Sequence, residues 1–285
     1  MRHSWLKAAI ASAALVGLGT EAALAACPSE EVIDAFIADW KAGTPTTAIA
    51  VDATVEDALC AQGKVVARLK EDLGAPVGYK AGLTSQAAQE RFGVDQPVRG
   101  VLLEGMLLES GATVPAAFGA RPLFEADLLV VVADDGINQA TTPGKVLPHI
   151  SEVIPFIELP DLVLAEGEPM SGPILTAINV GARQGVLGPR IAVEQSDSFL
   201  QSLADMEVEV LDERGEQLAL AKGEAVLGHP LNSVIWLVQS GVTLAPGDYV
   251  SVGSFGSLLP TAHGLTATAT YLGLPGDPQV TVSFD

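Results

Sequence analysis

The chain has 285 residues and a formal net charge of −20, because 35 Asp and Glu residues outweigh 15 Lys and Arg residues. Nucleic-acid affinity depends mainly on cationic side chains that neutralise phosphates, so this charge argues against a nucleic-acid partner. Apolar residues make up 48% of the sequence and charged residues 18%. This composition excludes a largely disordered chain and predicts a globular protein with a large core, for which we expect one domain.

Residues 1–26 have the pattern of a secretory signal peptide. Arg2 and Lys7 precede an apolar run over residues 8–19, and small residues at 23–25 form an A-x-A cleavage site. The run is shorter than the roughly 20 residues that a membrane-spanning helix needs, and no later stretch reaches that length without a charge or a turn residue. We therefore expect an exported, periplasmic protein without a transmembrane segment.

The chain has two cysteines, Cys27 and Cys60. In an exported protein an even number of cysteines indicates a disulfide, which here would close a long loop. A second interpretation comes from residues 24–27, Leu-Ala-Ala-Cys, which have the small-residue pattern of a bacterial lipoprotein cleavage box. In that case Cys27 would carry a lipid anchor and Cys60 would have no partner. The sequence leaves both possibilities open.

Residues 27–75 are predicted to form a helical N-terminal segment. Apolar residues recur at helical spacing from Val32 to Trp40, and Gly43 ends this first helix. Thr54 and Asp57 have the spacing of an N-terminal capping box for a second helix, which a glycine and a proline stop at 74–76. The two cysteines lie at or in these helices, so a bridge between them is geometrically reasonable.

The pattern changes after residue 76 to short apolar runs separated by Gly, Pro and Asp, which indicates a strand-rich body over residues 76–285. The predicted strands cover residues 101–108, 123–132, 154–159, 206–211, 249–252, 265–271 and 280–284. A hairpin turn is predicted around Gly215, leading into a strand at 218–220. One further helix is predicted over residues 230–240, with Pro230 near its start and Gly241 after its end.

Three carboxylates in this body indicate a metal site. Glu125 and Asp127 lie two residues apart on a predicted strand and therefore point to the same face. Glu158 lies in an apolar segment, where an unpaired charge is costly. Oxygen-rich carboxylate sites suit hard divalent ions, so Mg²⁺ or Mn²⁺ is the predicted cofactor. The competing interpretation is a solvated face of a half-exposed sheet.

Lys80 is the candidate acid or base. It lies between Gly78 and Gly82 in an apolar segment, and a lysine in a desolvated site can transfer protons or bind a substrate carboxylate. The local sequence on its own favours the alternative, a surface lysine in a glycine-rich turn.

Taken in order, several segments resemble the fumarylacetoacetate hydrolase superfamily, specifically its 2-keto-4-pentenoate hydratase and 2-oxo-acid decarboxylase branch. The resemblance runs from about residue 28 to the C-terminus. The matching segments are 78–85 (GYKAGLTS), 92–97 (FGVDQP), 100–102 (GVL), 124–127 (FEAD), 158–161 (ELPD), 226–232 (VLGHPLN), 236–237 (WL), 244–248 (LAPGD) and 253–254 (GS).

The resemblance implies an α+β fold, the mixed β-roll of this superfamily with N-terminal helices packed on it. It also implies that Glu125, Asp127 and Glu158 hold the divalent metal. The implied activity is that of a lyase, in which the metal chelates a small 2-oxo acid and stabilises the enolate formed during hydration or decarboxylation. Lys80 would transfer protons or bind the substrate carboxylate. Family members commonly form oligomers, so a homo-oligomer is expected.

Two further site residues follow from the resemblance. Asp161 matches a site residue of the hydratase branch and would assist catalysis, and Asn179 is the second candidate for substrate binding. Around them this sequence departs from the pattern of the branch at four positions. The branch usually has a serine, an arginine, an aspartate and a second serine where this sequence has Leu162, Val163, Ile178 and Gly181, respectively. Two alternatives therefore stay open: an acylpyruvate-type C–C hydrolase using the same metal site, and a family member that binds a ligand without turnover.

Overall fold

Two helices begin the computed structural model, which describes residues 27–285; the predicted signal peptide, residues 1–26, lies outside the described residues. Helix α1 covers Glu30–Ala42 and ends at Gly43 in the left-handed conformation. Helix α2 covers Val55–Leu73, and the Thr54 hydroxyl accepts a hydrogen bond of 3.1 Å from the Asp57 amide. This is the N-terminal cap that the sequence predicts, because a hydroxyl satisfies an amide that has no partner within the helix.

A disulfide joins Cys27 to Cys60 and so connects the start of the described chain to the N-terminal half of α2. The sequence separation is 33 residues. Lys64 and Arg68, also on α2, reach Glu30 at the start of α1 with distances of 2.9 and 2.8 Å. The two helices are thus held together covalently and by ion pairs around a buried apolar contact that includes Ile33 and Phe36.

The body contains two mixed sheets, as the α+β prediction requires. The larger sheet has the order β2-β1-β11-β5-β6-β7-β3, with β12 paired to β5 and β8 paired to β6. Its strands are β1 (Pro76–Gly82), β2 (Val98–Leu103), β3 (Leu107–Glu109), β5 (Leu123–Val132), β6 (Ile150–Leu159), β7 (Gln184–Leu187), β8 (Ile191–Ala192), β11 (Tyr249–Ser251) and β12 (Leu259–Pro260).

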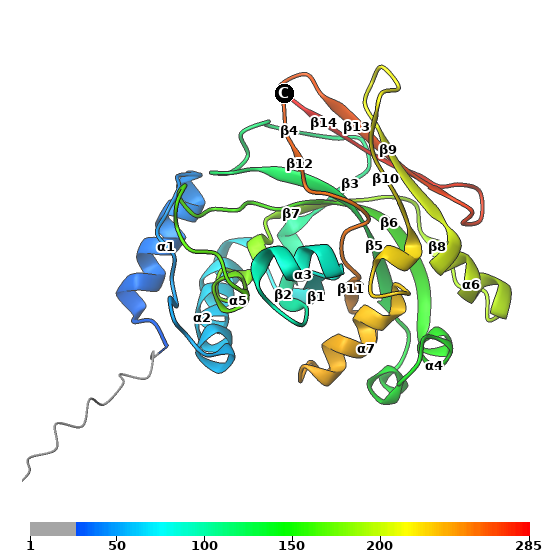
Figure 1. Cartoon of the computed structure of the whole chain (residues 1–285), viewed down its shortest axis with the longest axis horizontal. Helices are drawn as coiled ribbons and strands as arrows, with labels where there is room; N and C mark the ends of the chain where they lie inside the picture. The colour runs from blue at the N-terminus through cyan, green and yellow to red at the C-terminus, as the bar shows by residue number, and fades with distance from the viewer. Residues whose placement is uncertain (1–26) are drawn as a thin grey trace, which may run out of the picture.

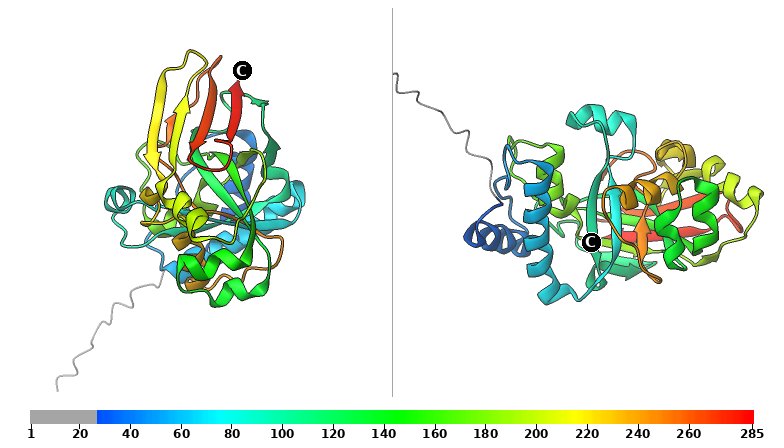
Figure 2. Two further views of the ribbon diagram at one scale, coloured as in Figure 1. Left: turned by 90° about the vertical axis from the view of Figure 1, so that its right-hand side faces the viewer. Right: turned by 90° about the horizontal axis from the view of Figure 1, so that it is seen from below.

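The second sheet has the order β10-β9-β13-β14-β4. Its strands are β4 (Ala112–Val114), β9 (Glu207–Leu211), β10 (Gln217–Lys222), β13 (Thr266–Leu272) and β14 (Gln279–Phe284). It lies at the opposite end of the molecule from α1 and α2 (Figure 1) and stands above the larger sheet when the molecule is turned (Figure 2). Apolar residues of both sheets, among them Phe124, Ile157 and Phe284, form one hydrophobic cluster between them.

The remaining helices are short and surround the larger sheet: α3 (Gln86–Phe92), α4 (Pro143–Val146), α5 (Gly172–Ala177), α6 (Asp197–Asp205) and α7 (Leu231–Gln239). Helix α7 confirms the helix predicted over 230–240. No helix in residues 27–285 combines the length and the apolar character needed to cross a lipid bilayer.

Two predicted elements need correction. The single strand predicted over residues 101–108 is two strands, β2 and β3, separated by a 3₁₀ turn at Glu104–Met106. The break has a steric reason, because Gly105 packs against the backbone of Leu73 at the end of α2, where a Cβ would meet the Leu73 carbonyl oxygen at 3.0 Å. The segment around Lys80, for which no strand was predicted, is β1, paired with β2 and β11.

Candidate metal and catalytic centre

The neighbouring strands β5 and β6 place the three predicted carboxylates on one face of the larger sheet. They pair antiparallel, with Glu125 opposite Glu158 and Asp127 opposite Phe156. Because side chains alternate along a strand and directly paired residues share a face, Glu125, Asp127 and Glu158 all point to the same side. The same face continues into a small apolar cluster that includes Ile154 and Phe156.

These carboxylates are not on a solvated surface, so the half-exposed sheet considered from the sequence is wrong here. Asp127 has no exposed surface and Glu158 is 2% exposed. Glu125 is half-buried and lines a pocket. Burying several negative charges together is unfavourable unless positive charge or hydrogen-bond donors compensate for them.

Lys80 supplies the positive charge. It lies on β1, two strands away from β5 in the sheet order, and its ammonium nitrogen contacts the Glu158 carboxylate. The same nitrogen donates a hydrogen bond of 3.2 Å to the Val180 carbonyl oxygen. Lys80 is 3% exposed, which rules out the surface turn considered from the sequence. Glycine at position 100 makes room for it, because a Cβ there would lie 2.8 Å from the Lys80 Cγ.

Hydrogen-bond donors from β5, from the end of β11 and from the segment after it compensate for Asp127. Its carboxylate accepts hydrogen bonds from the Ser251 hydroxyl, from the Gly253 amide at 3.0 Å and from the Leu128 amide at 2.5 Å. Gly253 has φ +106°, and the Thr84 side chain occupies the place where its Cβ would be, so only glycine fits there. Ser251 was missed from the sequence, because no local pattern indicates that β11 lies beside β5.

The electrostatics favour protonation of two of the carboxylates. Burial, reinforced by the nearby Glu158 charge, raises the pKa of Asp127 to about 7, although the three hydrogen bonds act in the opposite direction. Burial and the Glu158 charge also raise the pKa of Glu125 well above its usual value, against the opposing effect of Lys80. One ammonium group therefore does not neutralise the site, and a further cation would be favourable.

A pocket of about 320 Å³ opens above this floor. Lys80 and Glu125 line its base, and α3 covers one side with Ala88 and Arg91. Most of its remaining wall is apolar or carries hydroxyl groups; these residues are Leu83, Thr84, Ser85, Phe92, Pro160, Leu162, Leu175, Val180, Ser254, Ser257 and Leu258. The volume is near the lower end of the range for small-molecule sites.

Asp161 does not line this pocket, although its chain neighbours Pro160 and Leu162 do. Its carboxylate is fully buried and accepts hydrogen bonds from the amides of Ala120 and Arg121 at 3.1 and 2.8 Å. Arg183 adds an ion pair at 3.2 Å, and Gly119 packs directly against the carboxylate. Asp161 does not line the pocket, so the direct catalytic role expected from the resemblance finds no geometric support; its neighbour Leu162 lines the pocket instead.

Asn179 is also engaged elsewhere. Its amide group accepts a hydrogen bond of 2.8 Å from the Val101 amide and donates one of 3.0 Å to the Val101 carbonyl. These bonds occupy both ends of the side chain, which is 1% exposed. Asn179, Val180 and Gly181 have consecutive positive φ angles of 57°, 55° and 65°. This conformation is costly for the β-branched Val180, and the Asn179 bonds hold it in place, so that the Val180 carbonyl accepts from Lys80.

Within residues 27–285, no three His, Cys, Asp or Glu side chains converge closely enough to surround one ion as the structure stands. Glu158 is engaged with Lys80, and Asp127 with Ser251 and Gly253. The three carboxylates thus share a face of the sheet without forming a closed cage, and of the three Glu125 lines the pocket.

A curled mixed sheet that presents buried carboxylates and one lysine beneath a pocket defines an enzyme of the fumarylacetoacetate hydrolase type. No protein-family model matches the sequence. A protein from Yersinia pestis CO92 assigned to the fumarylacetoacetate hydrolase family shares the fold, with a TM-score of 0.52 at 14% identity over 75% of this chain and 95% of that one.

Two further comparisons identify the branch. The 2-keto-4-pentenoate hydratase from Burkholderia vietnamiensis is 32% identical over 202 residues, which cover 70% of this chain and 75% of that protein. The 4-oxalocrotonate decarboxylase from Pseudomonas putida G7, solved with magnesium and adipate, superposes with a TM-score of 0.77 at 25% identity and covers 91% of this chain and all of that one. The chain belongs to the hydratase and decarboxylase branch of the fumarylacetoacetate hydrolase superfamily, a branch of lyases.

Proposed function

We propose that this protein is a divalent-metal-dependent lyase, of hydratase or decarboxylase type, that acts on a small 2-oxo acid. The observation that carries the proposal is the face of the larger sheet next to the 320 Å³ pocket, where Glu125, Asp127 and Glu158 lie together. Glu125 and Lys80 line the pocket, and Glu158 lies behind them in contact with Lys80. Three carboxylates against one ammonium group leave an excess of negative charge that a divalent ion would balance.

The donor set fits such an ion. Carboxylate oxygens are the ligands that Mg²⁺ and Mn²⁺ prefer, and Glu125, Asp127 and Glu158 are the residues that would hold it. When bound, a divalent ion polarises a 2-oxo carbonyl and stabilises the negative charge that develops during hydration or decarboxylation. The magnesium found in the related decarboxylase supports this assignment.

Lys80 is the residue proposed to act on the substrate. Its ammonium group is desolvated, lies at the pocket floor and is held from two sides by Glu158 and the Val180 carbonyl. From this position it can either transfer a proton or bind the substrate carboxylate, and both roles need a cation that does not move into solvent. Asn179 acts as a positioning residue through Val180, and Asp161 as a structural anchor through Arg183.

Calorimetric titration of Mg²⁺ and Mn²⁺ into the chelator-treated protein tests the metal site. We expect saturable binding by the parent, and its loss in Glu125→Ala and in Glu158→Ala. Glu152→Ala is the matched control, because Glu152 lies on the same strand, β6, but pairs with Arg190 outside the pocket and should leave binding unchanged. Absence of binding in the parent would refute the metal-dependent lyase.

A screen of 2-oxo acids then distinguishes the activities. Hydration, loss of CO₂ or cleavage of an acylpyruvate yields different products, which mass spectrometry separates. Metal binding without turnover of any 2-oxo acid would favour a ligand-binding protein over an enzyme. The resemblance also predicts a homo-oligomer, and the molecular mass of the same preparations in solution would test this prediction.

We also propose export to the periplasm, with Cys27 in a disulfide rather than lipidated. The bridge to Cys60 supports this, because disulfides persist in oxidising compartments and a lipidated Cys27 could not form one. Intact-mass analysis of the protein from the native compartment should show an unlipidated chain that begins near residue 27 and has no free thiol. Reduction should lower the free energy of unfolding by about 3–4 kcal/mol, measured by urea denaturation. A lipid-sized mass increment on Cys27 would contradict the proposal.

A further inference from the structure

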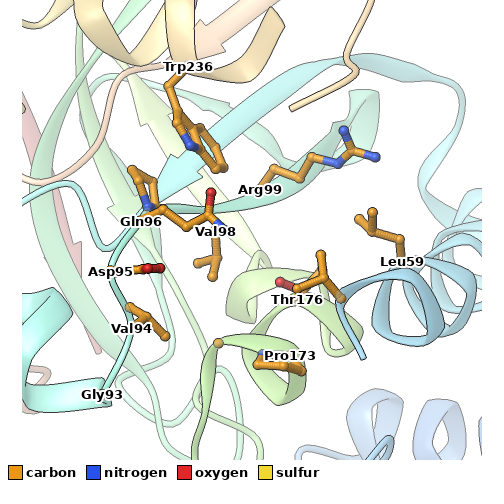
Figure 3. Close-up of a pocket in the computed structure, with 13 residues that line it drawn as sticks. Leu59, Gly93, Val94, Asp95, Gln96, Val98, Arg99, Pro173, Thr176 and Trp236 are labelled. Carbon is orange, nitrogen blue, oxygen red and sulfur yellow. The ribbon is translucent and has the colours of Figure 1, made fainter. Parts of the chain in front are cut away.

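A second cavity, of about 530 Å³, lies outside the proposed catalytic centre between α2, α5, α7 and the segment that leads into β2 (Figure 3). We propose that it binds a small amphipathic monocarboxylate, with the carboxylate at Arg99 and the apolar part against Trp236, Leu59 and Val94. The metal-dependent activity proposed for the catalytic pocket does not involve the residues of this cavity.

The cavity is separate from the catalytic pocket, because the two have no lining residue in common. They are nevertheless adjacent. Helix α5 contributes Leu175 to the pocket and the next residue, Thr176, to the cavity, and α3 with the residues that follow it contributes Phe92 to the pocket and Gly93 to the cavity. A ligand in the cavity would therefore contact walls that also shape the catalytic pocket.

Arg99 provides the reason to expect an anion. Arg99 is half-buried, and none of the ion pairs within residues 27–285 involves it. One nitrogen, Nη1, donates to the Ser240 carbonyl and lies 3.3 Å from the Ser240 hydroxyl. Burial lowers the pKa of Arg99, in agreement with a charge that lacks a counter-ion. Arginine presents further donors in a planar fork suited to a carboxylate.

The other residues that line the cavity indicate the chemistry of the rest of the ligand. Trp236, Leu59, Val94 and other apolar residues line most of the cavity, which favours a hydrocarbon body. The Asp95 carboxylate and the Arg99 guanidinium lie on opposite sides of the cavity (Figure 3). A second carboxylate at the far end of a ligand would therefore approach Asp95 and be repelled. The cavity should select monocarboxylates over dicarboxylates of the same length.

Three six-carbon probes test this: hexanoate, hexan-1-ol and adipate. They are titrated into the full chain in the presence of a chelator, with tryptophan fluorescence and calorimetry as readouts. We expect saturable binding of hexanoate and at least about 10-fold weaker binding of hexan-1-ol, which cannot form the charge-assisted hydrogen bond to Arg99. Adipate should also bind more weakly than hexanoate, because its second carboxylate approaches Asp95. The fluorescence change should be absent in Trp236→Phe while the calorimetric signal is retained.

Variants on either side of the cavity make the test specific. Arg99→Met should weaken hexanoate binding at least about 10-fold without changing the affinity for hexan-1-ol. Asp95→Asn should reduce the preference for hexanoate over adipate. Asp95 is exposed, and the expected change is tighter binding of adipate relative to hexanoate, which misfolding of the variant could not produce. Glu125→Ala, in the catalytic pocket, should bind hexanoate as the parent does.

Three outcomes would overturn the proposal. Hexanoate that binds Arg99→Met as well as the parent would show that the guanidinium does not take the carboxylate. Hexanoate binding that becomes either tighter or weaker in Glu125→Ala would place the ligand in the catalytic pocket. Absence of hexanoate binding in the parent would show that no monocarboxylate site of this kind exists, whether or not the metal titration succeeds.

Discussion

Replacing Lys80 by methionine is expected to lower turnover of the 2-oxo-acid substrate by about 10²–10⁴-fold, the range for loss of a group that transfers a proton. Methionine preserves much of the length and the apolar stem while removing the cation. Mg²⁺ binding should be retained or strengthened, because Glu158 loses its only ion-pair partner among the described residues. The measurement combines steady-state kinetics with Mg²⁺ calorimetry on the same preparation.

Lys145→Met is the matched control, since Lys145 is exposed on α4 and outside the pocket. It should change neither turnover nor metal affinity.

The stability of Lys80→Met should also change. Removing one partner of a buried ion pair commonly costs 3–5 kcal/mol, so the metal-free variant should unfold at a lower urea concentration than the parent, and added Mg²⁺ should restore this stability. Full turnover in Lys80→Met would remove Lys80 from the mechanism, even if the metal site is confirmed.

The second large effect concerns Asp127. Burial raises its pKa from 3.8 to about 7, so between these values the folded protein binds more protons than the unfolded chain. The free energy of unfolding of the metal-free protein then falls as pH rises through this window, on the order of 4 kcal/mol in total from this group. Glu125, whose pKa is also raised, acts in the same direction. Below pH 4 this loss of stability is absent.

Asp127→Asn isolates the effect, because it removes the titrating group and keeps the shape. We expect the difference in unfolding free energy between Asp127→Asn and the parent, both metal-free, to shift in favour of the variant as pH rises from 4 to 8. Urea denaturation at a series of pH values measures this difference. Comparing the two proteins cancels the titration of carboxylates far from this centre. The pKa of Glu125 should be lower in Asp127→Asn, because the Asp127 charge helps to raise it, and this change acts in the same direction. A difference that does not vary with pH would contradict the raised pKa.

Addition of Mg²⁺ should reverse the trend in the parent. A divalent ion binds the deprotonated carboxylates, so its stabilisation should grow with pH over the same window and be accompanied by proton release. Asp127→Asn should show little of this stabilisation at any pH.

The sequence carries the information for the local features of this protein. Glu125 and Asp127 lie two residues apart and are followed by an apolar run, which predicts a strand. Strand geometry alone places both carboxylates on one face, although it does not determine whether that face is buried. The spacing of Thr54 and Asp57 likewise sets the start of α2. Such features depend on neighbours a few residues apart and need no knowledge of the rest of the chain.

The tertiary structure decides which of these residues meet. The parallel pairing of β1 with β11 brings Lys80 into register with Ser251, 171 residues later in the sequence, and no local pattern encodes that pairing. The tertiary structure also pairs Asp161 with Arg183, and it places Asn179 where its side chain accepts a hydrogen bond from the Val101 amide. Both residues lie close in sequence to residues of the pocket, but their side chains are engaged elsewhere. Strand and helix patterns depend on residues close together in the sequence, whereas the direction of a side chain at a site depends on contacts between distant segments. The sequence by itself therefore determined which chemical groups are available to this centre. The packing of distant strands determined which of these groups face the pocket.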